Sequence, residues 1–233
     1  APLLKETVRA KMLEASVRLA KLVGYRSAGT VEYLYDPASE KFYFLEVNTR
    51  LQVEHGVTEE VTNVDLVEWM IQEAAGELAN LTTLVSQPQG HSMQVRIYAE
   101  DCSNQFQPSI GMIDDIVWPE GVRIETSIQR GSNISTYYDP MVAKVIVHAE
   151  TREEVITKLQ QALSSMRVYG VTTNLQYLEQ LLTEEFVLSG AVYTNCLESF
   201  KPEEASIEVL DGGIQTTVQD FPGRIGHWDV GVP

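Results

Sequence analysis

The sequence contains few cysteines, few basic residues and no long apolar run. Its two cysteines, Cys102 and Cys196, lack the spacing of metal ligands, which excludes a zinc centre or disulfide framework and favours a reducing, cytoplasmic location. The 17 basic residues are outnumbered by 33 acidic ones, and a formal net charge of −16 would repel nucleic acid. Because no apolar stretch reaches about 18 residues, we expect no membrane segment, and we expect no signal peptide at the start.

Two further features are missing. No GxxxxGK motif or comparable glycine cluster, of the kind that covers nucleotide phosphates, precedes Glu32. No initiator methionine stands before Ala1, although residues 1–23 already have the apolar spacing of a helix, which Gly24 would end. We therefore expect the chain to be part of a longer polypeptide.

The most informative stretch is residues 42–60, FYFLEVNTRLQVEHGVTEE. In an extended strand alternate side chains share a face. One such face would hold aromatic, carboxylate, amide and guanidinium groups in order: Phe42, Phe44, Glu46, Asn48, Arg50, Gln52 and Glu54. The other face would be apolar. Alternation of this kind is also typical of any half-exposed strand, so by itself it does not indicate a site.

A second stretch, residues 29–36, precedes a proline-containing turn and predicts a β-hairpin with the first. If Asp36 pairs with Phe42, then Glu32 lies opposite Glu46, with their Cβ atoms about 5 Å apart. Two carboxylates so placed repel each other unless a cation lies between them, and Mg²⁺ prefers such oxygen ligands, with Asn48 as a third. A shift of one residue would put the glutamates on opposite faces, so this site depends on the register.

These segments, VEYLY and FYFLEVNTRLQVEHGVTE, resemble the core of biotin carboxylase, a member of the ATP-grasp enzymes. The resemblance implies ligands of Mg²⁺ or Mn²⁺ beside the ATP phosphates at Glu32, Glu46 and Asn48. It implies contacts with the nucleotide at Leu34, Glu46 and Thr194. It implies a bicarbonate pocket at Arg50, Gln52, Val53 and Glu54, with Glu54 as the general base. Most family members have proline after this E-H pair, whereas this chain has Gly56, as in the urea-using branch.

The second half of the chain extends the resemblance. Residues 91–100 alternate as a strand does, and VRIYAED is similar to the family's CRINAED segment, which implies that Arg96 holds the ureido oxygen of biotin. A fixed guanidinium suits that task because it stays charged and donates from a rigid fork. YYDPM is similar to the family's YYDSM near the biotin site. Asp139 is therefore either a biotin-site residue or an ordinary turn aspartate before proline. We interpret Arg123 as structural or interface-forming.

Turn and cap signals predict the remaining elements. A loop is expected through residues 53–58, a helix from Asn63 to Gly76, and a boundary loop at residues 78–90. A capping box at residues 151–154 predicts a helix that ends before Gly170, and a short helix follows at residues 174–182. Residues 207–233 resemble the first strands of the carboxyltransferase domain of urea carboxylases.

The expected fold class is α+β. Residues 1–84 would form the C-terminal part of an ATP-grasp domain, and residues 85–200 the biotin carboxylase C-terminal domain, with a mixed or antiparallel sheet and helices. Residues 201–206 would be a linker, and residues 207–233 the start of a carboxyltransferase domain.

The function implied by the resemblance is that of an ATP-dependent ligase, part of a urea carboxylase. Biotin would be carboxylated with ATP and bicarbonate, and the carboxyl group would pass to urea, giving allophanate. The biotin carrier domain must lie outside this chain, since no methionine here is followed by lysine. Further partners would be an upstream ATP-grasp half and a downstream carboxyltransferase domain, and we expect the chain to be inactive without them. The sequence does not decide whether the protein forms a homo-oligomer. The alternatives are the biotin carboxylase of an acyl-CoA or pyruvate carboxylase, and a non-catalytic fragment acting only in assembly.

Overall fold

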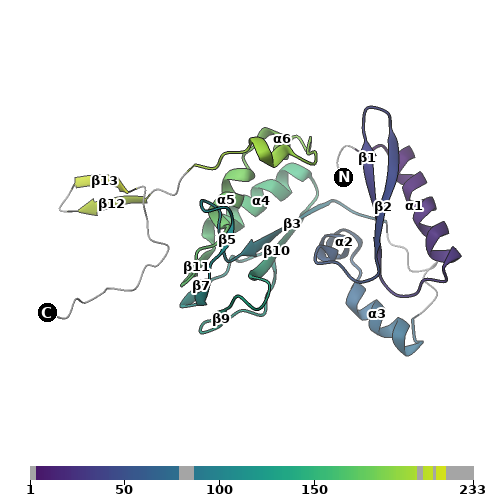
Figure 1. The fold of residues 1–233 in the computed structure, drawn as a ribbon, viewed down its shortest axis with the longest axis horizontal. Helices are drawn as coiled ribbons and strands as arrows, with labels where there is room; N and C mark the ends of the chain where they lie inside the picture. Colours follow the sequence, from purple (N-terminus) through teal and green to yellow (C-terminus); the bar gives the residue numbers. More distant parts are fainter. Residues whose placement is uncertain (1–3, 79–86, 204–206, 212–213, 219–233) are drawn as a thin grey trace.

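The computed structural model describes residues 4–78, 87–203, 207–211 and 214–218 (Figure 1). The first part of the chain contains a helix, a hairpin and two shorter helices: α1 (Glu6–Leu22), β1 (Thr30–Asp36), β2 (Lys41–Asn48), α2 (His55–Thr62) and α3 (Leu66–Ala75). In Figure 1 the hairpin stands beside α1, and α2 lies between the hairpin and the next sheet. Among the described residues, none of the helices has the length and hydropathy to cross a membrane.

The second part is built around a three-stranded sheet in the order β3 (His91–Tyr98), β10 (Met141–Ala149), β8 (Arg123–Glu125). Three short strand pairs flank it: β4 (Glu100–Asp101) with β5 (Gln107–Pro108), β6 (Gly111–Met112) with β9 (Asn133–Ile134), and β7 (Asp115–Val117) with β11 (Arg167–Tyr169). Its helices are α4 (Arg152–Ser165), α5 (Leu175–Leu181), α6 (Glu185–Leu188) and the 3₁₀ helix η2 (Cys196–Ser199). All described strand pairs are antiparallel, which confirms the α+β class and makes the sheet antiparallel rather than mixed.

The core lies between this sheet and α4. Many of its fully buried side chains come from the sheet strands, from α4 and from the residue after α4, among them Ile97, Val145, Val155, Leu159, Leu163 and Met166. The apolar residues of α4 recur at spacings of three and four, so one face of the helix covers the sheet while the opposite face stays in solvent. The second part therefore has the larger apolar core of the described chain.

The register of β1 and β2 confirms that Glu32 lies opposite Glu46. The pairing from which this was predicted is wrong at the turn, where Asp36 pairs with Lys41 rather than with Phe42. A β-bulge separates the two regions and shifts the register by one residue on the turn side. The bulge therefore brings both carboxylates to one face, because a hairpin that kept the register of its turn would pair Glu32 elsewhere.

The same bulge corrects the prediction of one continuous polar and aromatic face. Tyr33 lies opposite Phe44 while its neighbour Glu32 lies opposite Glu46, which leaves Leu45 without a partner across the hairpin. Adjacent residues of β1 point to opposite faces, so the rings of Phe42 and Phe44 do not share the face of the carboxylates. They pack on the ring of Tyr33 instead, at centroid distances of 5.2 and 6.4 Å, on the side of the hairpin that contacts α1.

Helix ends follow local side-chain chemistry. The capping box of α4 is confirmed, since Thr151 Oγ1 accepts from Glu154 N and Glu154 Oε2 accepts from Thr151 N. Asp65, not Asn63, caps α3, because its carboxylate accepts from the third backbone N–H of that helix. Asn63 instead ends α2 in the left-handed conformation, which asparagine tolerates.

The tail begins with a β-hairpin. β12 (Ile207–Asp211) pairs antiparallel with β13 (Ile214–Val218). The rest of the predicted tail, residues 219–233, lies outside the described residues, and so does most of the predicted boundary loop, residues 79–86.

Substitution at Gly170 tests the packing of β11 against the strand that precedes β7. Gly170 has φ +102°, and an added Cβ would lie 2.0 Å from the Met112 carbonyl oxygen; Gly131 has φ +86° and open space around its Cα. We expect Gly131→Ala to cost about 1 kcal/mol in the free energy of unfolding through its left-handed backbone. Gly170→Ala should cost about 1–3 kcal/mol more, because backbone atoms must move. Guanidinium unfolding of both variants measures this, and equal losses would contradict the close approach.

Candidate functional site

Four of the predicted site residues form one hydrogen-bonded cluster on the hairpin. Asn48 Nδ2 donates to Glu32 Oε1 at 2.7 Å and to Glu46 Oε1 at 3.1 Å. Gln52 Nε2 donates to the same Glu32 oxygen at 2.9 Å. The two carboxylates thus face each other across the strands, as the sequence predicted, and the amide of Asn48 bridges them while Gln52 bonds Glu32 alone.

The segment after the hairpin is not the extended strand that was predicted. β2 ends at Asn48, and α2 begins at His55, so the expected loop through residues 53–58 is largely helix. His55 closes the turn, since its backbone N–H and its Nδ1 both lie within hydrogen-bond distance of the Gln52 carbonyl oxygen, at 3.2 and 2.8 Å. The chain has left β2 before Gln52, and the Gln52 side chain nonetheless reaches Glu32.

A second contact joins the two parts of the chain. Arg96 Nη2 of β3 donates to Glu54 Oε2 at 2.7 Å, although the two residues are 42 positions apart. Their side chains are 37% and 53% exposed, so both remain accessible to small molecules. The residue predicted to act as general base therefore touches the residue predicted to hold biotin.

The donor set on the hairpin fits a divalent cation. Carboxylate oxygens and a side-chain amide oxygen are the hard ligands that Mg²⁺ and Mn²⁺ prefer. Asn48 directs its amide nitrogen to both glutamates, and a half-turn of the amide would place its oxygen there instead. Two carboxylates that converge on one amide thus form an oxygen-lined position of the right chemistry.

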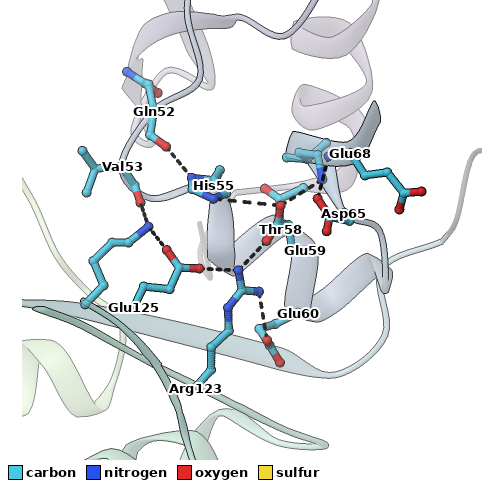
Figure 2. A network of polar contacts seen from close by, with 12 residues as sticks. Gln52, Val53, His55, Thr58, Glu59, Glu60, Asp65, Glu68, Arg123 and Glu125 are labelled. Carbon is cyan, nitrogen blue, oxygen red and sulfur yellow. Dashed lines mark hydrogen bonds and ion pairs between the residues drawn. The ribbon is translucent and has the colours of Figure 1, made fainter. Parts of the chain in front are cut away.

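Figure 2 shows an ion-pair network around Arg123 that the sequence did not predict as a unit. Arg123 Nη2 donates to Glu59 Oε2 at 2.6 Å and also to Glu125, and its Nη1 donates to Glu60 Oε1 at 3.2 Å. Glu59 is 7% exposed and its other oxygen accepts from the backbone N–H at the start of α3. The network ties α2 and α3 to β8.

Lys144 of β10 extends the network toward the site. Its Nζ forms an ion pair with Glu125 and donates to the carbonyl oxygen of Val53 at 2.9 Å. Burial by itself raises the pKa of the Glu125 carboxyl, but the hydrogen bonds from Lys144 and Arg123 outweigh it and hold that pKa below its ordinary value. Glu125 is therefore a permanent anion between two cations at neutral pH.

Three of these groups, His55, Glu59 and Glu125, place ligand atoms within 4.8 Å of one another. Metal-ligand chemistry is a poor fit at this position, because Arg123 and Lys144 already neutralise the carboxylates. His55 Nε2 stands 3.9 Å from Glu59 Oε1, a weak ion pair at most. The group acts as part of the ion-pair network.

Other predicted residues stand apart from the cluster. Arg50 contacts only the carbonyl of Leu51, at 3.4 Å, among the described residues. Leu34 is 54% exposed on the carboxylate side of β1, and Thr194 is exposed. Asp139 accepts from Met141 N at 2.9 Å, the bond of a turn aspartate. Within the described chain, no hydrogen bond or ion pair links these four to Glu32 or Glu54.

Lys144 and Glu125 are the residues that sequence reasoning missed. One signal was present for Lys144: it interrupts the apolar strand VAKVIVH, where a charge needs a buried partner. Glu125 gave no comparable signal, because an acidic residue at the end of a short strand is common.

Comparison with known families covers most of the chain. Residues 94–199 match the family described as the biotin carboxylase C-terminal domain, and residues 1–82 match the ATP binding domain of the carbamoyl-phosphate synthase L chain.

Urea amidolyase of Saccharomyces cerevisiae is 46% identical over all 233 residues, which cover 13% of that protein. A putative urea carboxylase of Emericella nidulans is 42% identical over 228 residues, 93% of this chain and 18% of that protein. The crystal structure of Kluyveromyces lactis urea carboxylase matches with a TM-score of 0.86 and 44% identity, over 90% of this chain and 19% of that one. The chain therefore spans only a small part of these relatives.

A biotin carboxylase domain dimer of Hydrogenobacter thermophilus 2-oxoglutarate carboxylase, in complex with MgADP and bicarbonate, matches with a TM-score of 0.79 and 38% identity, over 84% of this chain and 44% of that one. The antiparallel hairpin, the helix-covered sheet and the two family matches define part of a biotin carboxylase, an ATP-grasp ligase. Within this class the chain belongs to the family of urea carboxylases and urea amidolyases, to which it is similar over its full length.

The ion-pair network predicts a specific dependence of stability on pH. The pKa of Glu125 lies below its ordinary value of 4.5, so its carboxylate stabilises the folded state above pH 4.5, and this contribution is lost as pH falls through the folded-state pKa. We expect the difference in unfolding free energy between the wild type and Glu125→Gln to shrink as pH is lowered from neutral to below 4.5. Denaturant unfolding at a series of pH values measures it.

The exposed residue Glu120 provides the control for this experiment. Glu120→Gln should differ from the wild type by a small amount that changes little with pH. A pH-independent difference for Glu125→Gln would contradict the depressed pKa.

Proposed function

We propose that this chain supplies the metal-facing, bicarbonate-facing and biotin-facing side of the biotin carboxylase site of a urea carboxylase. The observation that carries the proposal is the 2.7 Å contact between Glu54 and Arg96. One residue comes from the segment after the hairpin and the other from the sheet of the second part. A carboxylate and a guanidinium in contact at an accessible position can serve two substrates in succession. The carboxylate can accept the proton of bicarbonate, and the guanidinium can bind the ureido oxygen of biotin.

In this proposal Glu54 is the general base. Its half-exposed carboxylate takes the proton of bicarbonate, which leaves a bicarbonate oxygen free to attack the γ-phosphate of ATP. Arg50 and Gln52 hold the anion by charge and by an amide donor, and Val53 borders the same pocket. Arg50 is free to turn toward a bound anion, since its guanidinium makes a single long contact in the structure.

Arg96 holds the second substrate group. Its guanidinium stays charged throughout and donates in a fixed geometry, so it stabilises negative charge on the ureido oxygen of biotin. Biotin, when bound, supplies the ureido nitrogen that receives the carboxyl group. In the structure Arg96 is bound to Glu54, and this ion pair orients the guanidinium toward the site before biotin binds. Asp139 lies on the loop that would border the biotin ring.

Glu32, Glu46 and Asn48 would hold Mg²⁺ or Mn²⁺. The ion would neutralise charge on the ATP phosphates when bound. Gln52 connects this position to the bicarbonate pocket, because its side chain bonds Glu32 while its carbonyl anchors His55. Leu34 and Thr194 would contact the nucleotide.

Urea is the proposed carboxyl acceptor. Support comes from the similarity to urea amidolyase over 100% of the chain, including residues 207–233, whereas methylcrotonoyl-CoA carboxylase of Arabidopsis thaliana is 41% identical over 87% of it. In the parent enzyme, urea rather than an acyl-CoA should stimulate ADP release. Carboxyl transfer gives allophanate, and the nucleotide lid, carrier and carboxyltransferase would come from segments outside this chain. The two free cysteines are consistent with a cytoplasmic location.

Replacement of the base tests the assignment directly. In the parent enzyme, Glu54→Gln should lower bicarbonate-dependent ADP formation by about 10²–10⁴-fold, the usual contribution of a general base. Binding of MgATP should stay unchanged, because among the described residues the Glu54 side chain bonds Arg96 and no hydrogen bond or ion pair joins it to Glu32, Glu46 or Asn48. Initial-rate assays and a nucleotide titration measure the two quantities.

Glu14→Gln, on the exposed side of α1, is the matched control and should behave as the wild type. Near-normal turnover of Glu54→Gln would contradict the assignment of Glu54 as the general base. A loss of nucleotide binding in the same variant would show that the residue acts through structure instead.

A further inference from the structure

Three charged residues lie in one row across the three-stranded sheet. Lys144 of β10 pairs with Arg96 of β3 on one side and with Glu125 of β8 on the other. Directly opposed residues share a face of the sheet, so the order on this face is guanidinium, ammonium, carboxylate. This face meets the segment between the hairpin and α2, at Val53 and Glu54.

The two cations of this row should repel each other. Like charges directly opposite on a sheet are destabilising, and the Lys144 side chain is only 8% exposed, so water screens it little. The repulsion is offset because each cation has a separate acceptor: Glu54 for Arg96, and Glu125 with the Val53 carbonyl for Lys144. The segment at residues 53–54 thus accepts one bond from each cation.

Lys144 is held firmly in place. Glu125, its ion-pair partner, is itself held by Arg123, and Arg123 also binds Glu59 and Glu60 of α2 (Figure 2). The helix that follows Glu54 and the carbonyl that precedes it are therefore fixed to the same sheet.

We infer that Lys144 is a positioning residue for Glu54: by anchoring the Val53 carbonyl it sets the place of the base relative to Arg96 and to the bicarbonate pocket. Lys144 does not touch the reacting atoms in this role. The peptide group that it binds is the one that leads into Glu54, so a shift of that peptide moves the base directly. The catalytic consequence of this inference rests on the proposed function. The anchoring of the Val53 carbonyl by Lys144 does not depend on that function.

Kinetics of the parent enzyme test the inference. Lys144→Met removes the donor and keeps much of the side-chain volume. We expect it to lower kcat/KM for bicarbonate about ten- to a hundredfold, because a displacement of about 1 Å at a reacting group costs rate by a factor of this size. The KM for ATP should not change. Lys144→Gln, which is too short to reach Val53, should have the same effect on bicarbonate kinetics and the same unchanged KM for ATP. It replaces the Met variant if that variant does not fold.

The matched control is Lys158→Met. Lys158 Nζ also donates to a backbone carbonyl, that of His148, at 3.1 Å, but it lies on α4, away from the site. It should leave kcat/KM for bicarbonate and the KM for ATP unchanged. If the Lys144 variants keep the wild-type kcat/KM for bicarbonate, or lower the melting temperature alone, the positioning role is overturned.

Hydrogen exchange separates this inference from the proposed function. The amides of His55 and Val57 bond to the carbonyls of Gln52 and Glu54 and report on the segment. Faster exchange there in Lys144→Met than in Lys158→Met supports the anchor, and equal exchange refutes it. If the wild-type enzyme shows no bicarbonate-dependent ADP formation, the proposed function fails, and the exchange result still decides whether Lys144 anchors the segment.

Discussion

The contact between α2 and the sheet of the second part is the constraint on which the site depends. This contact combines charge with one close approach. Gly56 is buried, and an added Cβ would lie 2.4 Å from Ile146 Cδ1, so any larger residue there would require the Ile146 side chain to move. Beside it, Arg123 neutralises the buried Glu59, and Lys144 neutralises the partly buried Glu125.

Around this contact the chemistry divides between the two parts of the chain. The hairpin presents carboxylates and amides, which are ligands for a hard cation, and the sheet presents the guanidinium of Arg96. Glu54 lies between the two parts of the chain. The peptide group before it is held by Lys144, and α2 begins directly after it. A base in such a place is oriented by both parts, so its geometry depends on how they pack.

Much of the site could be foreseen from the sequence because it is local. Glu32, Glu46 and Asn48 converge since an antiparallel hairpin brings nearby residues together, and the turn between the strands is short. It was harder to predict which side chains share a face of the hairpin. A bulge at Leu45 reverses the side on which the aromatic residues lie, and side-chain alternation cannot show where an extra residue enters a strand.

The sequence by itself determined the α+β class, the capping box of α4, the hairpin and the identity of the acid, amide and guanidinium groups, because these depend on neighbours within a few residues or on recognisable motifs. Tertiary structure alone decided that α2 begins at His55, that Arg96 meets Glu54, and that Lys144 binds the Val53 carbonyl. Those contacts join residues 42 and 91 positions apart, and their partners are chosen by how the two parts pack, which no local pattern records.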